Sequence, residues 1–293
     1  MSFFETQERN LFLASYLNAN LESFVYNKKK IDFIIIHHEI GQALSSLVEI
    51  NESLITPDFL DFIESMSQDK GYKKINFRIT PSLKSINSNV LKLLLLRGYN
   101  TQLTFTSLLL LDIDLAVIWS NLRKSFKSLI NKEIKNTTTK FYDWSSSEDF
   151  LFVDWISLYG DAVKRGSKEL SKESISIMQN TIKNDKGFIT LCYEDNQLLG
   201  AILFNYHTGI AYYSAAANTP LVESSKERNI GHLLMWQGIK KLKEIGCHTL
   251  EIGPLDFENQ PCSISNPKLL NITNFKLGFG GDIVAVFNFT KML

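Results

Sequence analysis

The apolar residues of this chain follow two spacings, every second residue in some stretches and every third to fourth in others. Alternation of Ile75, Phe77 and Ile79 predicts a half-buried strand. The longer spacing predicts an amphipathic helix after Thr56 and Pro57, because threonine is a good N-cap and proline suits the first helical turn. The first half is therefore expected to hold strands over Ile31–Ile36, Lys74–Thr80 and Thr101–Ile113, and helices over Glu5–Leu17, Pro57–Gly71 and Asn89–Arg97.

The second half is expected to begin with a helix over Leu115–Ile134, capped by Asp114. Short turn-forming pairs then separate three apolar runs, which predicts an antiparallel meander. A helix, a strand, a polar loop, a short helix and a last strand follow. This order repeats that of the first half, so we expect two similar α/β units. The expected elements are strands Thr138–Trp144, Gly187–Tyr193, Gln197–Asn205, Ile210–Ala216, Thr249–Gly253 and Ile283–Thr290, and helices Ser147–Val163, Ser171–Lys183 and Lys226–Gly246.

Composition and charge narrow the functional classes. Of the 293 residues, 44% are hydrophobic and 21% are charged, which is typical of a globular protein and not of a disordered one. The formal net charge is zero, which disfavours DNA binding and weighs against a large tRNA footprint. The apolar runs are too short to cross a bilayer, and the three cysteines have no CxxC spacing. With no signal-peptide pattern, we expect a cytoplasmic protein. Contact with a membrane surface and the oligomeric state are left open.

The last quarter of the chain carries a resemblance to a known family. It reads "GHLLMWQGIKKLKEIG", then "TLEIG", then "FKLGFGG" before a final apolar strand. These motifs resemble the C-terminal half of the FemAB-like acyltransferases, relatives of the GNAT acetyltransferases that include the aminoacyltransferases of peptidoglycan bridge synthesis. The order of elements suits that family over most of the chain. The resemblance implies an α/β fold of tandem GNAT-like lobes, with mixed sheets flanked by helices. The lobes would be a partial N-terminal lobe (1–114), a basic connecting helix (115–137) and a C-terminal lobe (138–293).

Acyl transfer to an amine requires a neutral acceptor, stabilisation of the carbonyl oxygen as it becomes negative, and a site that holds both substrates. In the aminoacyl-transferring members of the family, a Phe–Lys pair before the final glycine-aromatic turn lies at the reaction centre. Phe275-Lys276 matches this pair, so the resemblance implies catalytic roles for both residues. The alternative is that Lys276 is an exposed lysine at a helix end, where it is favourable for the helix dipole.

The start of the helix before "TLEIG" is a second candidate site. GNAT acetyltransferases hold the diphosphate of coenzyme A on a (Q/R)-x-x-G-x-(G/A) loop at this point. Arg228 and Gly231 match that pattern and are candidate cofactor-binding residues, whereas Leu233 stands where a small residue is required. The mismatch agrees with the FemAB-like proteins, which depart from this loop. We expect acyl-CoA as a co-substrate and no tightly bound cofactor.

Other residues are candidates for contact with substrates. His232 and Trp236 lie one helical turn apart and share a face. His232 is a candidate proton acceptor, the alternative being a packed core histidine. Tyr212 and Ser214 are expected on one face of a strand. That face either contacts the acceptor substrate or packs in the core.

Charged residues complete the set of candidates. Glu251 and Asp256 lie at the end of a strand and in the loop after it, where α/β sheets commonly bind ligands, although loop acids are often only solvated. The basic face of the 115–134 helix either binds the diphosphate of a nucleotide-linked acceptor or is only exposed to solvent. The candidate diphosphate-binding residues are Arg123, Lys124 and Lys127. The sequence has no HExxH, P-loop, dinucleotide-binding or GxSxG pattern, so no metal is expected.

These observations predict an N-acyltransferase of cell-envelope biogenesis. The expected acceptor is an amino group on a nucleotide- or carrier-linked amino sugar of polysaccharide biosynthesis, or on a peptidoglycan peptide. The expected donor is acyl-CoA or aminoacyl-tRNA. The alternative is a catalytically inactive GNAT-like module that binds a sugar nucleotide or a partner protein.

Overall fold

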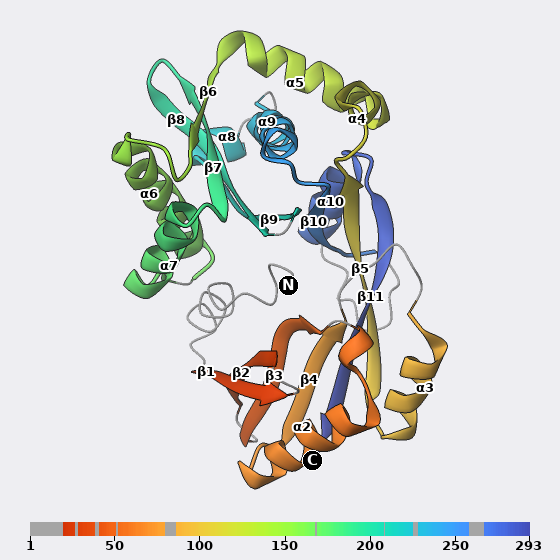
Figure 1. Ribbon diagram of the computed structural model, residues 1–293. Coiled ribbons are helices and arrows are strands. Elements are labelled where there is room, and N and C mark those ends of the chain that lie inside the picture. Colours follow the sequence, from red (N-terminus) through yellow and green to blue (C-terminus); the bar gives the residue numbers. More distant parts are fainter. Residues whose placement is uncertain are drawn as a thin grey trace. The chain divides into compact units, whose positions relative to one another are not determined.

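The computed structural model describes residues 20–26, 29–38, 41–50, 52–79, 86–167, 169–207, 209–224, 228–257 and 267–293. The chain forms two compact units (Figure 1). The first comprises the described residues up to Thr106 together with Ile283–Leu293, and the second comprises those from Ser107 to Asp282. The division into lobes at residues 114 and 137 stays a prediction. The expected helix Glu5–Leu17 lies outside the described residues.

The first unit is built on a mixed sheet. Its strands are β1 (Asn20–Tyr26), β2 (Lys29–His38), β3 (Gly41–Ile50), β4 (Lys74–Ile79) and most of β11 (Asp282–Met292) and β5 (Asn100–Leu110), in the order β1-β2-β3-β4-β11-β5. β3 and β4 are parallel, whereas β4 and β11 are antiparallel. The predicted strand Ile31–Ile36 is confirmed within β2. β1 and β3 were not among the expected strands.

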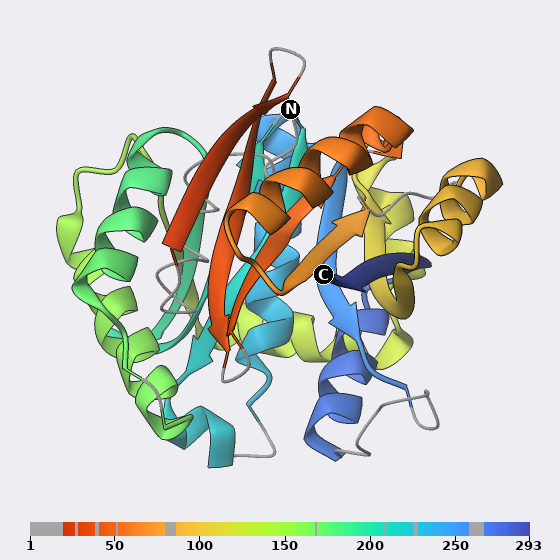
Figure 2. The ribbon, with the colours of Figure 1, turned by 90° about the horizontal axis from the view of Figure 1, so that it is seen from below.

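Helix α2 (Pro57–Asp69) forms much of the core of the first unit. It begins as predicted, because the Thr56 hydroxyl oxygen accepts a hydrogen bond from the Phe59 N–H at 3.2 Å and Pro57 occupies the first turn. Its apolar face packs on β4 (Figure 2). In the same core, the Phe77 ring lies 5.4 Å from Phe289 of β11. The last strand therefore belongs to the core of this unit. The other helices among the described residues of this unit are η2 (Glu52–Leu54) and α3 (Ser88–Leu96).

The second unit holds the predicted meander. Strands β6 (Thr138–Tyr142), β7 (Gly187–Glu194), β8 (Gln197–His207) and β9 (Ile210–Asn218) pair antiparallel in chain order. β10 (Thr249–Leu255) pairs parallel with β9. The helices are α4 (Leu115–Asn121), α5 (Lys124–Asn136), α6 (Asp149–Arg165), α7 (Lys172–Lys183), α8 (Pro220–Ser224), α9 (Ile230–Ile245) and α10 (Pro267–Leu277). The mixed α/β architecture expected from the sequence is confirmed.

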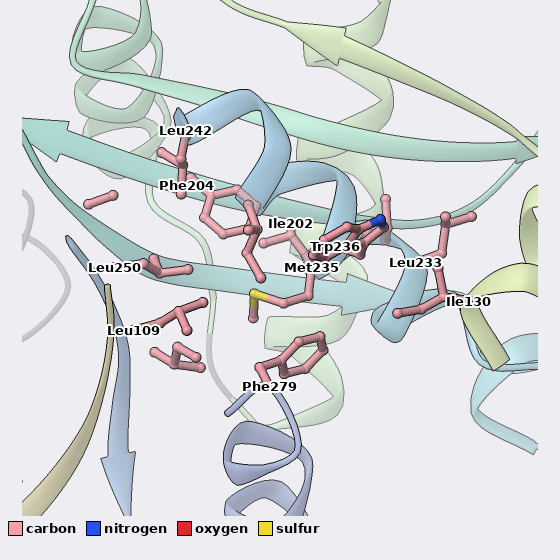
Figure 3. Packing of buried hydrophobic residues seen from close by; sticks show 14 of the residues in the cluster. Leu109, Ile130, Ile202, Phe204, Leu233, Met235, Trp236, Leu242, Leu250 and Phe279 are labelled. Atoms are coloured by element: carbon pink, nitrogen blue, oxygen red, sulfur yellow. The ribbon is translucent and has the colours of Figure 1, made fainter. Parts of the chain in front are cut away.

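Helix α9 occupies the centre of the second unit. It lies against β7, β8 and β9, and α5 packs on it. Figure 1 shows α9 on one face of this sheet and α6 and α7 on the other. Figure 3 shows side chains of α9 meeting those of the surrounding strands and of the turn after α10, with Leu233, Met235, Trp236, Leu242, Ile202, Phe204, Leu109, Leu250 and Phe279 in one cluster.

Two helices differ from their predicted bounds by more than a shift of one or two residues. The single helix expected over Leu115–Ile134 is interrupted at Leu122, whose backbone is extended (ψ 143°). The break lets the Arg123 N–H donate to the Gly278 carbonyl at 2.9 Å, a long-range contact that local periodicity does not contain. The helix expected from Lys226 begins at Ile230, because Asn229 is its non-helical N-cap residue.

Candidate active site

The pairing between β9 and β10 covers only the first part of β10. The pairing of β10 with β9 runs from Thr249–Ile210 to Glu251–Tyr212. Two residues further along β9, its register with β8 shifts, so that Ser214 is an extra residue between the positions facing Leu203 and Phe204. This is a β-bulge, a feature that redirects side chains and is frequent beside active sites. The bulge also interrupts the alternation from which Tyr212 and Ser214 were expected to share a face.

Lys276 lies in the last turn of α10, and its side chain reaches the segment that follows β10. The residue is only 6% exposed, and its Nζ donates a hydrogen bond to the Pro254 carbonyl at 2.6 Å. Gly253 has a positive φ of 94°, which favours glycine, and it lies against the Lys276 side chain, with the Nζ 3.4 Å from the position of a Cβ atom. Lys276 is therefore a buried lysine, and not the exposed helix-end lysine of the alternative interpretation.

Two acidic residues act on this cation. Burial lowers the pKa of Lys276, whereas the charges of Asp256 and Glu251 oppose that shift. Glu251 is buried in β10, and Asp256 is partly exposed just after it. The Asp256 N–H donates to the Thr273 hydroxyl at 2.8 Å, which ties this segment to α10. The structure thus brings together three residues that the sequence singled out separately.

Phe275, which precedes Lys276 in the sequence, and His232 belong to an aromatic cluster. The His232 ring lies 4.2 Å from the Phe126 ring and 5.1 Å from the Phe275 ring, both edge-on. Phe279 completes the group at 5.1 Å from Phe275. Burial, together with the nearby charge of Arg123, lowers the pKa of His232 to about 4. His232 is therefore neutral at pH 7 and a weaker proton acceptor than an ordinary histidine.

The remaining substrate-binding candidates differ in exposure. Trp236 is buried and its ring lies 4.8 Å from the Trp119 ring, so it is part of the core. Tyr212 is also buried. Ser214 is exposed, and its hydroxyl donates to the Tyr212 carbonyl at 3.3 Å. Of these three, Ser214 is the side chain that solvent reaches.

Three basic candidates gather at the start of α5. Arg123 is the N-cap residue and lies over the Phe126 ring, with its guanidinium carbon 5.3 Å from the ring centroid. Lys124 is exposed, and the Lys127 Nζ donates to the Ser120 carbonyl at 2.8 Å. A helix N-terminus carries partial positive charge, so these cations add to a local positive field. Their role toward a diphosphate stays a prediction.

The candidate coenzyme A loop is already engaged with other groups. The Arg228 guanidinium donates two hydrogen bonds to the Glu194 carboxylate, one of them at 2.9 Å. Gly231 lies beside the Phe275 ring, which a Cβ atom there would meet at 3.7 Å. The Asn229 N–H donates to the carboxylate of Glu133 at 3.1 Å. Sequence reasoning missed Glu133 and Glu194; the available signal was that Glu133 is the sole acid in the basic α5 segment.

In the described part of the chain, no three histidine, cysteine or acidic side chains gather closely enough to hold a metal ion. None of its helices combines the length and the apolar character that a membrane crossing requires. Cys192 and Cys247 are buried free thiols, and burial raises the pKa of each to about 11. Cys262 lies outside the described residues.

The fold has counterparts among solved structures. FemX matches with a TM-score of 0.74 at 10% identity, covering 99% of this chain and 92% of FemX. The C-terminal domain of a putative lysylphosphatidylglycerol synthetase from Agrobacterium fabrum matches with a TM-score of 0.64 at 10% identity. The match covers 98% of this chain and 87% of that domain. A tandem GNAT protein from the clavulanic acid biosynthesis pathway matches with a TM-score of 0.55 at 9% identity. The match covers 96% of this chain and 87% of that protein.

These similarities show that the chain has a FemAB-like fold of the tandem GNAT type, as the resemblance implied. No family model and no curated protein matches the sequence.

Proposed function

We propose that this protein is an acyltransferase that moves an acyl or aminoacyl group onto an amino group of a cell-envelope precursor. The observation that carries the proposal is the buried Lys276 ammonium, held by the Pro254 carbonyl where β10 ends. A FemAB-like fold of the tandem GNAT type supports the same chemistry. The acceptor class follows from the sequence resemblance.

The proposed reaction uses Lys276 as an electrostatic catalyst. The lone pair of the acceptor amine forms a C–N bond to the donor carbonyl carbon, and the carbonyl oxygen becomes negative. An ammonium has three hydrogen-bond donors, so Lys276 can bind this oxygen while it also contacts Pro254. The ester C–O or thioester C–S bond of the donor then breaks as the carbonyl re-forms, and the tRNA oxygen or the coenzyme A sulfur leaves with the electron pair of that bond. Stabilisation of such an oxyanion is commonly the largest contribution to catalysis.

The proton released by the amine needs an acceptor. Asp256 suits this role better than Glu251, because it is the more exposed of the two acids near Lys276. His232 is the less suitable base, since its pKa of about 4 makes it a weak proton acceptor at pH 7. We assign His232 and Phe275 to the packing that positions Lys276, and Asp256 to proton transfer.

Both donor classes fit the proposal, because acyl-CoA and aminoacyl-tRNA each present an activated carbonyl. Arg123, Lys124 and Lys127 at the start of α5 suit the phosphates of a nucleotide- or carrier-linked acceptor. The exposed Ser214 at the β-bulge suits contact with either substrate. The donor is identified by incubating the protein with acceptor amines and either acyl-CoA or aminoacyl-tRNA, and detecting the amide by mass spectrometry.

The central test replaces Lys276. Lys276→Ala should reduce turnover about 10²- to 10³-fold, the usual effect of losing one oxyanion donor. Lys268→Ala is the matched control, since Lys268 is an exposed lysine on the same helix. It should retain activity, and circular dichroism should show native folding for both variants. Full turnover by folded Lys276→Ala would refute the mechanism. Substrate binding without any amide product would favour the inactive binding module.

A further inference from the structure

A buried carboxylate lies at the start of α9. Glu133 of α5 is only 1% exposed, and its Oε1 accepts a hydrogen bond from the Asn229 N–H at 3.1 Å. Asn229 is the N-cap residue of this 16-residue helix, and its own side chain makes no capping hydrogen bond. Glu133 therefore caps α9 from a position 96 residues away in the sequence.

The second carboxylate oxygen of Glu133 is buried and has no hydrogen-bond partner among the described residues. Burying part of a carboxylate without a hydrogen-bond partner is costly, so the helix terminus and the nearby charge of Arg228 must supply the compensation. The N-terminus of a helix is positively polarised and exposes N–H groups, and it is therefore a natural anion site. In this chain the anion is a side chain of the protein itself.

We propose that Glu133 is a resident anion that fills the N-terminus of α9 and excludes diphosphates from it. The donor of the proposed transfer, on which this inference rests, is consequently not anchored by a coenzyme A diphosphate at this helix. A coenzyme A donor has to be held through other groups. Glu133 thus acts as a specificity-determining residue.

The neighbouring residues agree with this role. Arg228, the cation of the coenzyme A pattern, already donates two hydrogen bonds to the Glu194 carboxylate. Leu233, which replaces the small residue of the pattern, is buried in the core. A diphosphate at this position would therefore meet a like charge from Glu133 and lack the guanidinium that normally neutralises it. The residues present do not fit the group that this helix holds in GNAT acetyltransferases.

The test is equilibrium binding without turnover. Isothermal titration calorimetry measures the binding of inorganic pyrophosphate and of coenzyme A to the chain of residues 1–293 and to three variants of it. Glu133→Gln removes the charge and keeps the size, whereas Glu133→Ala also removes the bulk. Glu244→Gln is the control, because it removes an exposed acid from the other end of α9.

The wild type and Glu244→Gln should bind pyrophosphate weakly, with a Kd above about 1 mM. Glu133→Ala should bind it about tenfold tighter or better, and Glu133→Gln should gain part of that increase. The amide signals of Asn229 and Gly231 should shift with pyrophosphate in the NMR spectrum of Glu133→Ala and not in that of the wild type.

Two results would overturn the inference. One is a wild type that binds pyrophosphate as tightly as Glu133→Ala, with the same two amide signals shifting. The other is a folded Glu133→Gln or Glu133→Ala that gains no affinity. If Glu133→Ala does not fold, Glu133→Gln decides alone. No transfer is measured, so failure here is distinguishable from failure of the Lys276 test.

Discussion

Two buried charges of the second unit, Lys276 and Glu133, are each met by a backbone group from a distant segment. Lys276 donates to the Pro254 carbonyl, and Glu133 accepts from the Asn229 N–H. Charges are costly to bury unless they are hydrogen-bonded, so these contacts reduce the cost of burying both side chains. The two charges have opposite signs and therefore opposite effects on an anionic group of a substrate. The cation attracts a developing oxyanion, whereas the carboxylate repels a diphosphate.

The shifted pKa of His232 makes protein stability depend on pH. Its folded-state pKa is about 4, against an ordinary value of 6.5, so between these values the unfolded chain binds the additional proton. The contribution of His232 to the free energy of unfolding is fully present above pH 6.5 and is lost as the pH falls toward 4. It amounts to at most about 3 kcal/mol. His232→Phe, which preserves an aromatic ring in the cluster, should flatten the loss of stability between pH 7 and pH 5.

Urea denaturation at pH 5, 6 and 7 measures this effect. His248→Gln is the control, because His248 is exposed and should leave the slope as in the wild type. An unchanged slope in His232→Phe would show that other groups cause the pH dependence.

At the level of elements, caps and periodic faces were predictable because their causes are local. Thr56 caps α2, and Asp114 accepts a hydrogen bond from the Ala116 N–H at 2.6 Å to cap α4, both as expected. The break after α4 depends on Gly278, which lies far along the chain. β1 and β3 were missed. In β3, Gly41–Ile50, the sequence GQALSSLVEI has no strict alternation of apolar and polar residues to mark a strand.

The candidate site was predictable only in part, for the same reason. Motif resemblance singled out Phe275 and Lys276 before any geometry was known. It did not contain the contact of Lys276 with Pro254, 22 residues away. Glu133 and Asn229 meet through the packing of α5 on α9, and no local pattern relates these two residues. Long-range contacts therefore decide which candidate residues are available to substrates.

The packing of α9 on β8 depends on a glycine. A Cβ atom at Gly238 would lie 2.2 Å from the Phe204 ring, which is fully buried and stacks on Phe188. Gly238→Ala should therefore lower the free energy of unfolding by about 1–3 kcal/mol. Gly160→Ala in α6 is the matched control, since its Cβ would meet nothing within 4 Å. It should raise stability by about 0.5–1 kcal/mol, because alanine favours a helix interior. Urea denaturation of both variants checks the predicted opposite signs; equal effects would contradict the packing argument.

For the whole molecule, the division of the chain does not follow the order of the sequence. The last strand, β11, lies between β4 and β5 in the strand order, although β10 and α10 before it belong to the second unit. Phe289 of β11 is fully buried in the core that contains Phe77. By contrast, the main core of the second unit draws every member from residues 109–279. The first unit therefore depends on the end of the chain, and the second does not.

This dependence predicts how fragments should behave. Residues 107–282 expressed alone should unfold cooperatively in urea, because their core is complete. Residues 1–106 alone should show no cooperative transition, since β4 and β5 lose the strand between them and Phe77 loses its partner Phe289. Joining 283–293 to residue 106 through a flexible linker should restore the transition, and Phe289→Ala in that joined fragment should abolish it again. Cooperative unfolding of 1–106 without β11 would show that the closing strand is dispensable, and that the first unit is complete before the second begins.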